Sequence, residues 1–131
     1  MNLFCYGSLQ FARVMRAVVG RDFAAEPAAL VGFARYRVRD AAYPGLLPEP
    51  GARTDGTLYR GLDDAAIRAL DHFEGAFYER LTLEIELASG ARESAQVYVV
   101  VPARREELSR DPWDASRFER HDLETFMRRI G

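Results

Sequence analysis

The most regular hydrophobic pattern of the chain lies between residues 81 and 101. Every second residue is apolar from Leu81 to Leu87, with Thr and Glu between them, and again from Ala95 to Val101. Alternation with a period of two is typical of a β-strand with one exposed face. Ser89-Gly90 lies between the two runs and favours a turn. The sequence therefore predicts an antiparallel hairpin with strands over 81–87 and 95–101.

Three other segments carry apolar residues three and four positions apart, which is the spacing of a helix with one buried face. They span residues 10–19, 64–74 and 118–130. Asp63 or Asp64 can cap the start of the second helix, and a glycine follows each of the first two helices at the place where a helix ends. These three segments are therefore predicted to be amphipathic helices.

The remaining chain predicts short strands and loops. Residues 2–6, 30–38 and 57–59 read as short strands. Residues 43–51 contain three prolines and two glycines and predict a loop, and the charged, poorly periodic stretch 102–113 predicts a surface loop. Together the elements predict one α+β domain with a mostly antiparallel, barrel-like sheet and two or three helices.

Composition narrows the classes of function. The chain has 131 residues, near the usual size of one domain, so a single domain over 1–131 is expected. Its net charge of -2 argues against nucleic-acid binding, and no apolar run has the length of a membrane span. All 18 basic residues are Arg, which excludes lysine Schiff-base chemistry. One cysteine and two histidines predict no disulfide and no metal site, and the expected location is cytoplasmic.

Glu74 is the first candidate for chemistry. It follows Ile67 by seven residues and Leu70 by four, so a continuous helix places its carboxylate on the apolar face. Burial and the negative end of the helix dipole both raise the pKa of a carboxyl group, as a general acid/base needs near neutral pH. The alternative is that the helix frays and Glu74 turns to solvent, where it pairs with Arg80.

The second candidate is the turn Tyr6-Gly7-Ser8-Leu9, which joins an apolar strand to a helix. Such a turn can direct backbone N–H groups at an anion, and Gly7 lets a ligand approach the backbone closely. A plain connection between strand and helix is the alternative.

Other polar side chains carry weaker signals. Tyr43, Tyr78 and Tyr98 are candidates for a pocket wall, or are ordinary half-buried tyrosines. Arg80 either binds a substrate carboxylate or pairs with Glu74 or Glu79. Several other titratable side chains are interpreted as structural or solvent-exposed. Cys5 reads as a buried, unreactive thiol, whereas His72, His121, Asp71, Glu79, Glu84 and Glu86 read as surface residues.

Several motifs in order resemble the gamma-glutamylcyclotransferase-like superfamily. Phe4–Leu9 is similar to its opening signature, and Leu70–Gly75, followed by Tyr78 and Arg80, is similar to its acidic motif. Tyr43-Pro44-Gly45 and Asp55–Tyr59 resemble the Tyr-Pro loop and Gly-containing strand of its shorter members. The closing helix, with Trp113, Phe118 and Phe126, resembles the plant avirulence-induced branch. The likeness covers nearly the whole chain.

The resemblance implies both a fold and a reaction. The fold is a small barrel-like α+β domain. The turn matching Tyr6, Gly7, Ser8 and Leu9 holds the glutamyl end of a small-molecule substrate, and Glu74 is the acid/base. The α-amine of a gamma-glutamyl amine or dipeptide attacks its own side-chain carbonyl, which releases 5-oxoproline and an amine or amino acid, with no cofactor or metal.

Two other functions remain open, a different acyl-transfer or amide-cleaving reaction on the same scaffold and a non-catalytic small-molecule-binding domain. The leaving group and the oligomeric state stay undetermined at this point.

Overall fold

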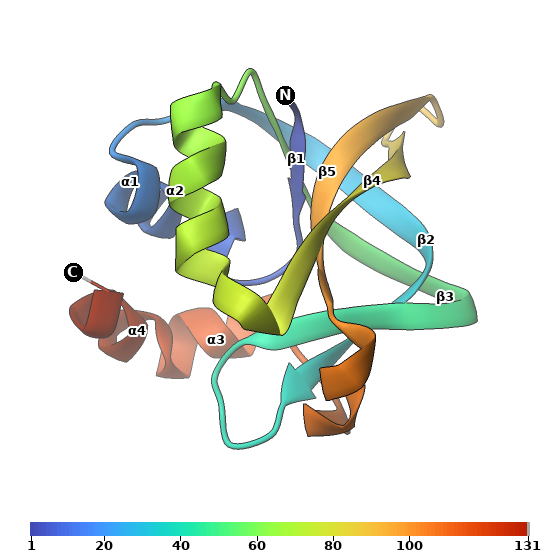
Figure 1. Cartoon of the computed structure of the whole chain (residues 1–131), viewed down its shortest axis with the longest axis vertical. Helices are drawn as coiled ribbons and strands as arrows, with labels where there is room; N and C mark the ends of the chain where they lie inside the picture. Colours follow the sequence, from blue (N-terminus) through green and yellow to red (C-terminus); the bar gives the residue numbers. More distant parts are fainter. Residues whose placement is uncertain (131) are drawn as a thin grey trace.

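Two long hairpins supply most of the sheet in the computed structural model, which describes residues 1–130 (Figure 1). β2 (Ala24–Val38) pairs with β3 (Pro44–Arg60), and β4 (Tyr78–Leu87) pairs with β5 (Arg92–Val100), both antiparallel. β1 (Leu3–Cys5) lies between β3 and β5 and is parallel to β5. Pairing of β2 with β4 closes these five strands into a mixed barrel. The predicted α+β fold with a mostly antiparallel, barrel-like sheet is confirmed.

The hairpin predicted from alternation is present with slightly different strand ends. Leu83 pairs with Ala95, and Gly90 has a positive φ of 89° in the connecting turn. Glycine adopts this backbone conformation without the steric cost that a Cβ would add. The alternating pattern therefore identified both the strands and the turn.

The prediction of a loop over 43–51 was wrong, because residues from Pro44 onward begin β3. Arg37 pairs with Pro44 and Phe33 with Pro48, and this half of β3 pairs with β2 alone. A strand with one free edge tolerates proline, since the missing N–H is not needed there. The pairing register shifts beside Gly32, so the paired strands bend where the sequence shows its run of Pro and Gly.

The predicted surface loop over 102–113 was also wrong. It contains a 3-10 helix, η3 (Pro102–Glu107), and a sixth strand, β6 (Leu108–Pro112), which pairs with the end of β2. Leu108 is buried against Val38 and Val100. The strand is too short to show an alternating hydrophobic pattern. Its extended conformation is stabilised by pairing with β2, which the local sequence does not indicate.

Four α-helices occur in the described residues, rather than the two or three expected. They are α1 (Ala12–Val19), α2 (Asp64–Glu74), α3 (Ala115–His121) and α4 (Leu123–Ile130). The predicted helix over 118–130 is broken at Asp122. Phe118 and Leu123 are five residues apart, so one straight helix would point them about 140° from each other. The break lets both side chains lie in the core.

The side chains of β1 alternate between two parts of the core. Leu3 and Cys5 pack on the side covered by the helices, whereas Phe4 points into the barrel. Figure 1 shows all four helices gathered on that one side, with α2 running beside β1. No helix within residues 1–130 has both the length and the apolar character needed to cross a bilayer. The space between the helices and the barrel is where the candidate site lies.

Candidate functional site

A cavity of about 260 Å³ lies where the end of β1, the C-terminus of α2 and the helix α4 meet. Segments far apart in the sequence contribute its walls. Its lining residues are Phe4, Cys5, Tyr6, Gly7, Ser8, Leu9, Tyr43, Pro44, Phe73, Glu74, Phe77, Tyr78, Tyr98, Phe126 and Ile130. The cavity therefore brings Glu74, the turn at 6–9 and the three candidate tyrosines to one place.

Glu74 occupies the last position of α2, on the same face as the buried Ile67 and Leu70. Asp63 caps the start of this helix by accepting a hydrogen bond from the N–H of Ala66 at 2.9 Å. Glu74 lies half-buried in the cavity wall, and no donor within residues 1–130 forms a hydrogen bond to its carboxylate. Burial raises the pKa of Glu74 to about 8.

The charge of Glu74 acts on the other titratable groups of the cavity. Burial raises the pKa of Cys5, Tyr6, Tyr78 and Tyr98, and the negative charge of Glu74 raises each further. These thiol and phenol groups are therefore protonated at neutral pH. Glu74 is the group that can exchange a proton there.

Two of these tyrosines tie the cavity walls together. The hydroxyl of Tyr6 donates to the carbonyl oxygen of Tyr98 at 2.5 Å, and that of Tyr78 donates to the carbonyl oxygen of Pro44 at 2.7 Å. Tyr43, the third candidate besides Tyr78 and Tyr98, is 40% exposed at the rim. The walls are thus joined by a bond from Tyr6, directly after β1, to β5 and by a bond from β4 to β3.

The turn after β1 contains backbone N–H groups that donate no hydrogen bond within residues 1–130. The carbonyls of Gly7 and Ser8 accept bonds from the N–H groups of Gln10 and Phe11, each at 3.1 Å, in the 3-10 helix η1 (Ser8–Gln10) and its end. The N–H groups of Gly7, Ser8 and Leu9 have no acceptor within residues 1–130. Unpaired N–H groups at such a turn can bind an anion or a carbonyl oxygen.

The position of Gly7 is constrained by its neighbour. A Cβ at this residue would lie 3.0 Å from two ring carbons of Pro44, closer than side chains ordinarily pack. Arg35 also donates to the carbonyl oxygen of Tyr6 at 2.8 Å. The turn is thus held between the first residue of β3 and a side chain of β2.

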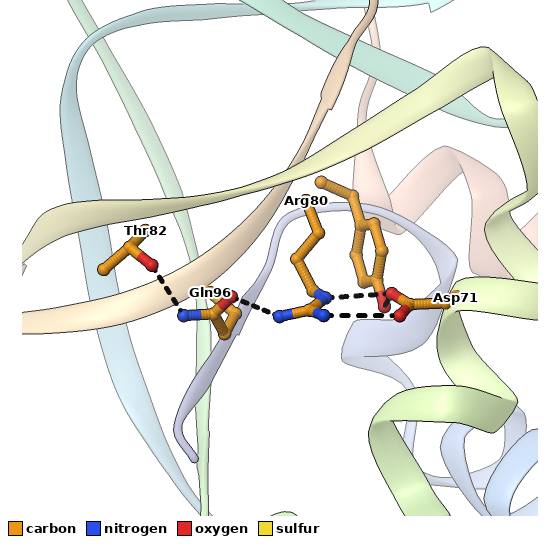
Figure 2. A network of polar contacts seen from close by, with 5 residues as sticks. Asp71, Arg80, Thr82 and Gln96 are labelled. Carbon is orange, nitrogen blue, oxygen red and sulfur yellow. Dashed lines mark hydrogen bonds and ion pairs between the residues drawn. The ribbon is translucent and has the colours of Figure 1, made fainter. Parts of the chain in front are cut away.

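Arg80 is not in the cavity, contrary to its assignment as a substrate-binding residue. Figure 2 shows its guanidinium bonded to Asp71, with Nε 2.9 Å from Oδ1, and to Gln96. Tyr98 also donates to Asp71 Oδ1, at 2.7 Å, and Gln96 donates to Thr82 at 2.9 Å. Asp71, whose side chain is 42% exposed, is therefore partly solvated as expected and is also the centre of a polar network. Glu74 follows it by one helical turn, without pairing with Arg80.

The sequence reasoning missed the aromatic and aliphatic walls. Phe73 and Phe77 flank Glu74, whereas Phe126 and Ile130 come from α4 and lie four residues apart. The rings of Phe73 and Phe126 meet edge to face with centroids 6.3 Å apart. The helical stripe of Phe126 and Ile130 was visible in the sequence. Nothing in that stripe indicated that it lies beside Glu74.

The arrangement can support proton transfer. A carboxyl group with a pKa of about 8 can take a proton from an amine and return it to another. Unpaired N–H groups can stabilise negative charge on an oxygen. Within residues 1–130 no group of three or more His, Cys, Asp or Glu side chains is placed to hold a metal ion.

Comparisons with known proteins identify a matching family and similar solved structures. The model of the family described as gamma-glutamyl cyclotransferase, AIG2-like, matches residues 3–116. The chain is 33% identical to AIG2-like protein C of Arabidopsis thaliana, over 96% of this chain and 73% of that protein. A solution structure of another A. thaliana protein, 26% identical, superposes with a TM-score of 0.76 and covers 98% of this chain and 78% of that one. A solved gamma-glutamyl cyclotransferase, only 12% identical, shares the fold with a TM-score of 0.67 over 99% of this chain and 85% of that one.

Proposed function

Because this chain belongs to the gamma-glutamyl cyclotransferase, AIG2-like family, we propose that it is a cyclotransferase acting on a small gamma-glutamyl compound. The substrate is a gamma-glutamyl amine or dipeptide, and the products are 5-oxoproline and a free amine or amino acid. The observation that carries the proposal is Glu74, a half-buried carboxyl group with a pKa of about 8 that lines a cavity together with a turn of unpaired N–H groups.

The proposed reaction is intramolecular and needs one acid/base. The α-amine of the glutamyl group forms a C–N bond to its own side-chain carbonyl carbon, and ionised Glu74 takes the proton that the amine loses. The carbonyl oxygen becomes negatively charged and is stabilised by N–H groups of Gly7, Ser8 or Leu9. Glu74 then gives its proton to the leaving nitrogen as the original C–N bond breaks. No electrons are transferred to or from the protein.

The cavity contributes by shaping the substrate. The amine and the carbonyl of one glutamyl group must approach each other before they react. A cavity that binds the substrate in this folded conformation lowers the entropic part of the reaction barrier. The hydroxyl of Tyr6 joins two of the walls by donating to the backbone carbonyl oxygen of Tyr98, and Tyr43 and Tyr78 complete the proposed binding surface. Arg80 has no place in this proposal as a substrate ligand, because Asp71 and Gln96 occupy it.

The test is release of 5-oxoproline, measured by mass spectrometry across a panel of gamma-glutamyl amines and dipeptides. Glu74→Gln keeps the size of the side chain but cannot carry a proton. We expect it to reduce kcat/KM by roughly two to four orders of magnitude, the usual contribution of a general acid/base. Near-normal turnover by this variant would contradict the role of Glu74.

Two controls separate rival reactions in the same assay. Glutamate in place of 5-oxoproline would indicate an amide hydrolase on this scaffold. Chelator treatment is expected to leave the rate unchanged, because the proposed proton transfers use Glu74 alone. Loss of activity that zinc restores would replace this mechanism by a metal-assisted one.

A further inference from the structure

A half-buried cation lies beside the turn at 6–9 but outside the cavity. Nη1 of Arg35, on β2, donates to two backbone carbonyl oxygens, that of Tyr6 at 2.8 Å and that of Asp55, on β3, at 3.1 Å. Arg35 does not line the cavity, and no step of the proposed reaction uses it. The reason for a charged side chain directed at the start of the turn therefore lies elsewhere.

Arg35 joins β1 to β3 just beyond the end of their backbone pairing. The last paired residues of the two strands are Cys5 and Thr57. The two carbonyls that accept from Arg35 follow directly, at Tyr6 on one side and at Asp55 on the other. The guanidinium thus continues the connection between the strands by one side-chain bridge and holds the start of the turn against β3.

The guanidinium of Arg35 is itself held in place. It lies 5.3 Å from the ring centroid of Trp113, within the range of a cation–π contact. The indole Nε1 of Trp113 in turn donates to the carbonyl oxygen of Ala42 at 2.7 Å. Burial lowers the pKa of Arg35, whereas the negative charges of Asp55 and Asp114 raise it. A guanidinium in this setting stays charged at neutral pH.

The carbonyl of Tyr6 and the N–H of Gly7 belong to the same peptide unit. This peptide bond is trans, so its carbonyl and its N–H point in opposite directions. A cation bound to the carbonyl therefore fixes the direction of the N–H, and it also polarises the unit so that the N–H becomes a stronger donor. Gly7 lines the cavity, and its N–H has no acceptor within residues 1–130.

This peptide unit needs an external restraint. Gly7 lacks the Cβ that limits backbone torsions, so rotation of the peptide plane is easier here than before another residue. The bond from the hydroxyl of Tyr6 to the carbonyl oxygen of Tyr98 fixes the side chain of Tyr6 rather than its peptide plane. The bond from Arg35 acts on the plane directly.

On these grounds we propose that Arg35 is a positioning residue, which directs and polarises the Gly7 N–H for the substrate oxygen that becomes negatively charged. The inference rests on the proposed cyclotransferase function and adds a residue outside the cavity on which the rate depends. A polarised donor gains most as charge develops on the oxygen, so the effect belongs to the transition state. Arg35 therefore acts on kcat more than on KM.

The first test is kinetic. Arg35→Met keeps an unbranched side chain that can pack on Trp113, but it has neither a charge nor an N–H donor. We expect kcat for release of 5-oxoproline to fall about tenfold to a hundredfold and KM to change by less than about threefold. Arg35→Lys keeps the charge and should have a kcat between those of Arg35→Met and the wild type. Equal rates of the two variants would contradict the effect of the charge.

The matched control is Arg37→Met, the same change two residues further along β2. The guanidinium of Arg37 pairs with Asp111, with 3.7 Å between nitrogen and oxygen, and neither residue lines the cavity. This variant should keep the wild-type kcat. A normal kcat in the folded Arg35→Met protein would overturn the inference.

The second test does not depend on turnover. Sodium formate supplies a charged oxygen for the turn, and nuclear magnetic resonance of the isotope-labelled protein follows the Gly7 amide during the titration. We expect the Gly7 proton signal to move downfield as formate binds, and the affinity measured there to fall at least about tenfold in Arg35→Met but not in Arg37→Met. An equal response of Gly7 in Arg35→Met and the wild type, or no response in the wild type, would overturn the inference.

Failure of the wider proposal looks different. If no gamma-glutamyl compound of the panel releases 5-oxoproline with the wild-type protein, the cyclotransferase function is wrong, and the formate titration still decides whether Arg35 controls the Gly7 N–H. If the wild type is active and Arg35→Met is equally active, only the inference about Arg35 falls.

Discussion

Glu74 is placed where its charged form is costly. Its carboxyl group is half-buried, receives no hydrogen bond within residues 1–130 and stands at the negative end of α2. The folded protein therefore keeps this proton up to a pH of about 8, whereas the pKa of an ordinary glutamate is 4.5. The raised pKa suits Glu74 to proton transfer near neutral pH. The same burial means that ionisation of Glu74 destabilises the folded state.

This conflict predicts a pH-dependent stability. Between pH 4.5 and about 8 the folded state holds one proton more than the unfolded state, so the free energy of unfolding falls as the pH rises through that window. Glu74→Gln removes the contribution of this group to the pH dependence. Its stability should match the wild type near pH 4 and exceed it increasingly up to pH 8, by at most about 5 kcal/mol at 1.4 kcal/mol per pKa unit, and by less where water enters the cavity.

Urea unfolding of both proteins at pH 5, 7 and 8.5 measures the effect. A difference that does not vary with pH would contradict the raised pKa of Glu74, whatever its role in catalysis. At pH 7 and above, the variant is expected to be more stable than the wild type and much less active.

At the scale of elements, one polar network fixes the last turn of α2 to the sheet. Asp71 on α2 binds Arg80 on β4, as Figure 2 shows, and it also accepts a hydrogen bond from Tyr98 on β5. Burial alone would raise the pKa of Asp71, but hydrogen bonds from Arg80 and Tyr98 outweigh it and lower that pKa. The carboxylate of Asp71 therefore stays charged and holds the helix in the register that presents Glu74 to the cavity.

We predict that Asp71→Asn lowers kcat through misplacement of Glu74. Loss of the charged acceptor should reduce the stability by about 1.5–3 kcal/mol, the usual value of a hydrogen bond to a charged group, less the screening at this partly exposed site. A displacement of Glu74 by a fraction of an ångström should lower kcat by about tenfold to a hundredfold, with a smaller effect on KM. Steady-state kinetics and urea unfolding measure the two effects.

Asp64→Asn is the matched control, because Asp64 is exposed in the first turn of the same helix. It should leave kcat unchanged. If the folded Asp71→Asn protein keeps a normal kcat, the network contributes to stability without positioning Glu74.

The helices and strands also show which structural features local sequence patterns predicted and which they missed. Alternation revealed the β4–β5 hairpin, and the helical spacing of Ile67, Leu70 and Glu74 placed the carboxylate correctly on the apolar face. The first half of β3 was missed because its order comes from pairing with β2, whereas its prolines signal a turn locally. Asp71 and Arg80 were read as separate surface and site residues, since their pairing depends on how α2 meets β4.

At the scale of the whole molecule, the barrel consists of the two hairpins and β1. The hairpins are joined at two short strand pairings, called seams here: β1 with β5, and β2 with β4. β1 meets β5 where Leu3 pairs with Gln96, and the N–H of Gln96 donates to the carbonyl oxygen of Asn2 at 2.8 Å. β2 pairs with β4 at Ala28 and Ala29. The bond from Tyr6 to the carbonyl oxygen of Tyr98 spans the first seam beside the cavity. That seam is therefore both a joint of the barrel and a wall of the candidate site.

We predict that Tyr6→Phe loosens this seam. Loss of the bond should cost about 1 kcal/mol and should speed hydrogen exchange of the Gln96 amide, which donates to Asn2, more than exchange of the amides that bond between β4 and β5. Exchange followed by nuclear magnetic resonance measures this directly. Tyr36→Phe is the control, because the hydroxyl of Tyr36 bonds to Glu49 away from the cavity. An equal effect on both regions would indicate that the barrel opens as one unit.

The parallel pairing of β1 with β5 also determines when the site comes into being. Each long hairpin joins neighbouring parts of the chain and can form within microseconds, but β1 must wait for partners that follow much later in the sequence. The turn at 6–9 lies directly after β1, so it takes its place only when the barrel closes. We therefore expect a partly folded chain with both hairpins intact to lack the cavity, and the candidate site to form only when β1 pairs and the barrel closes.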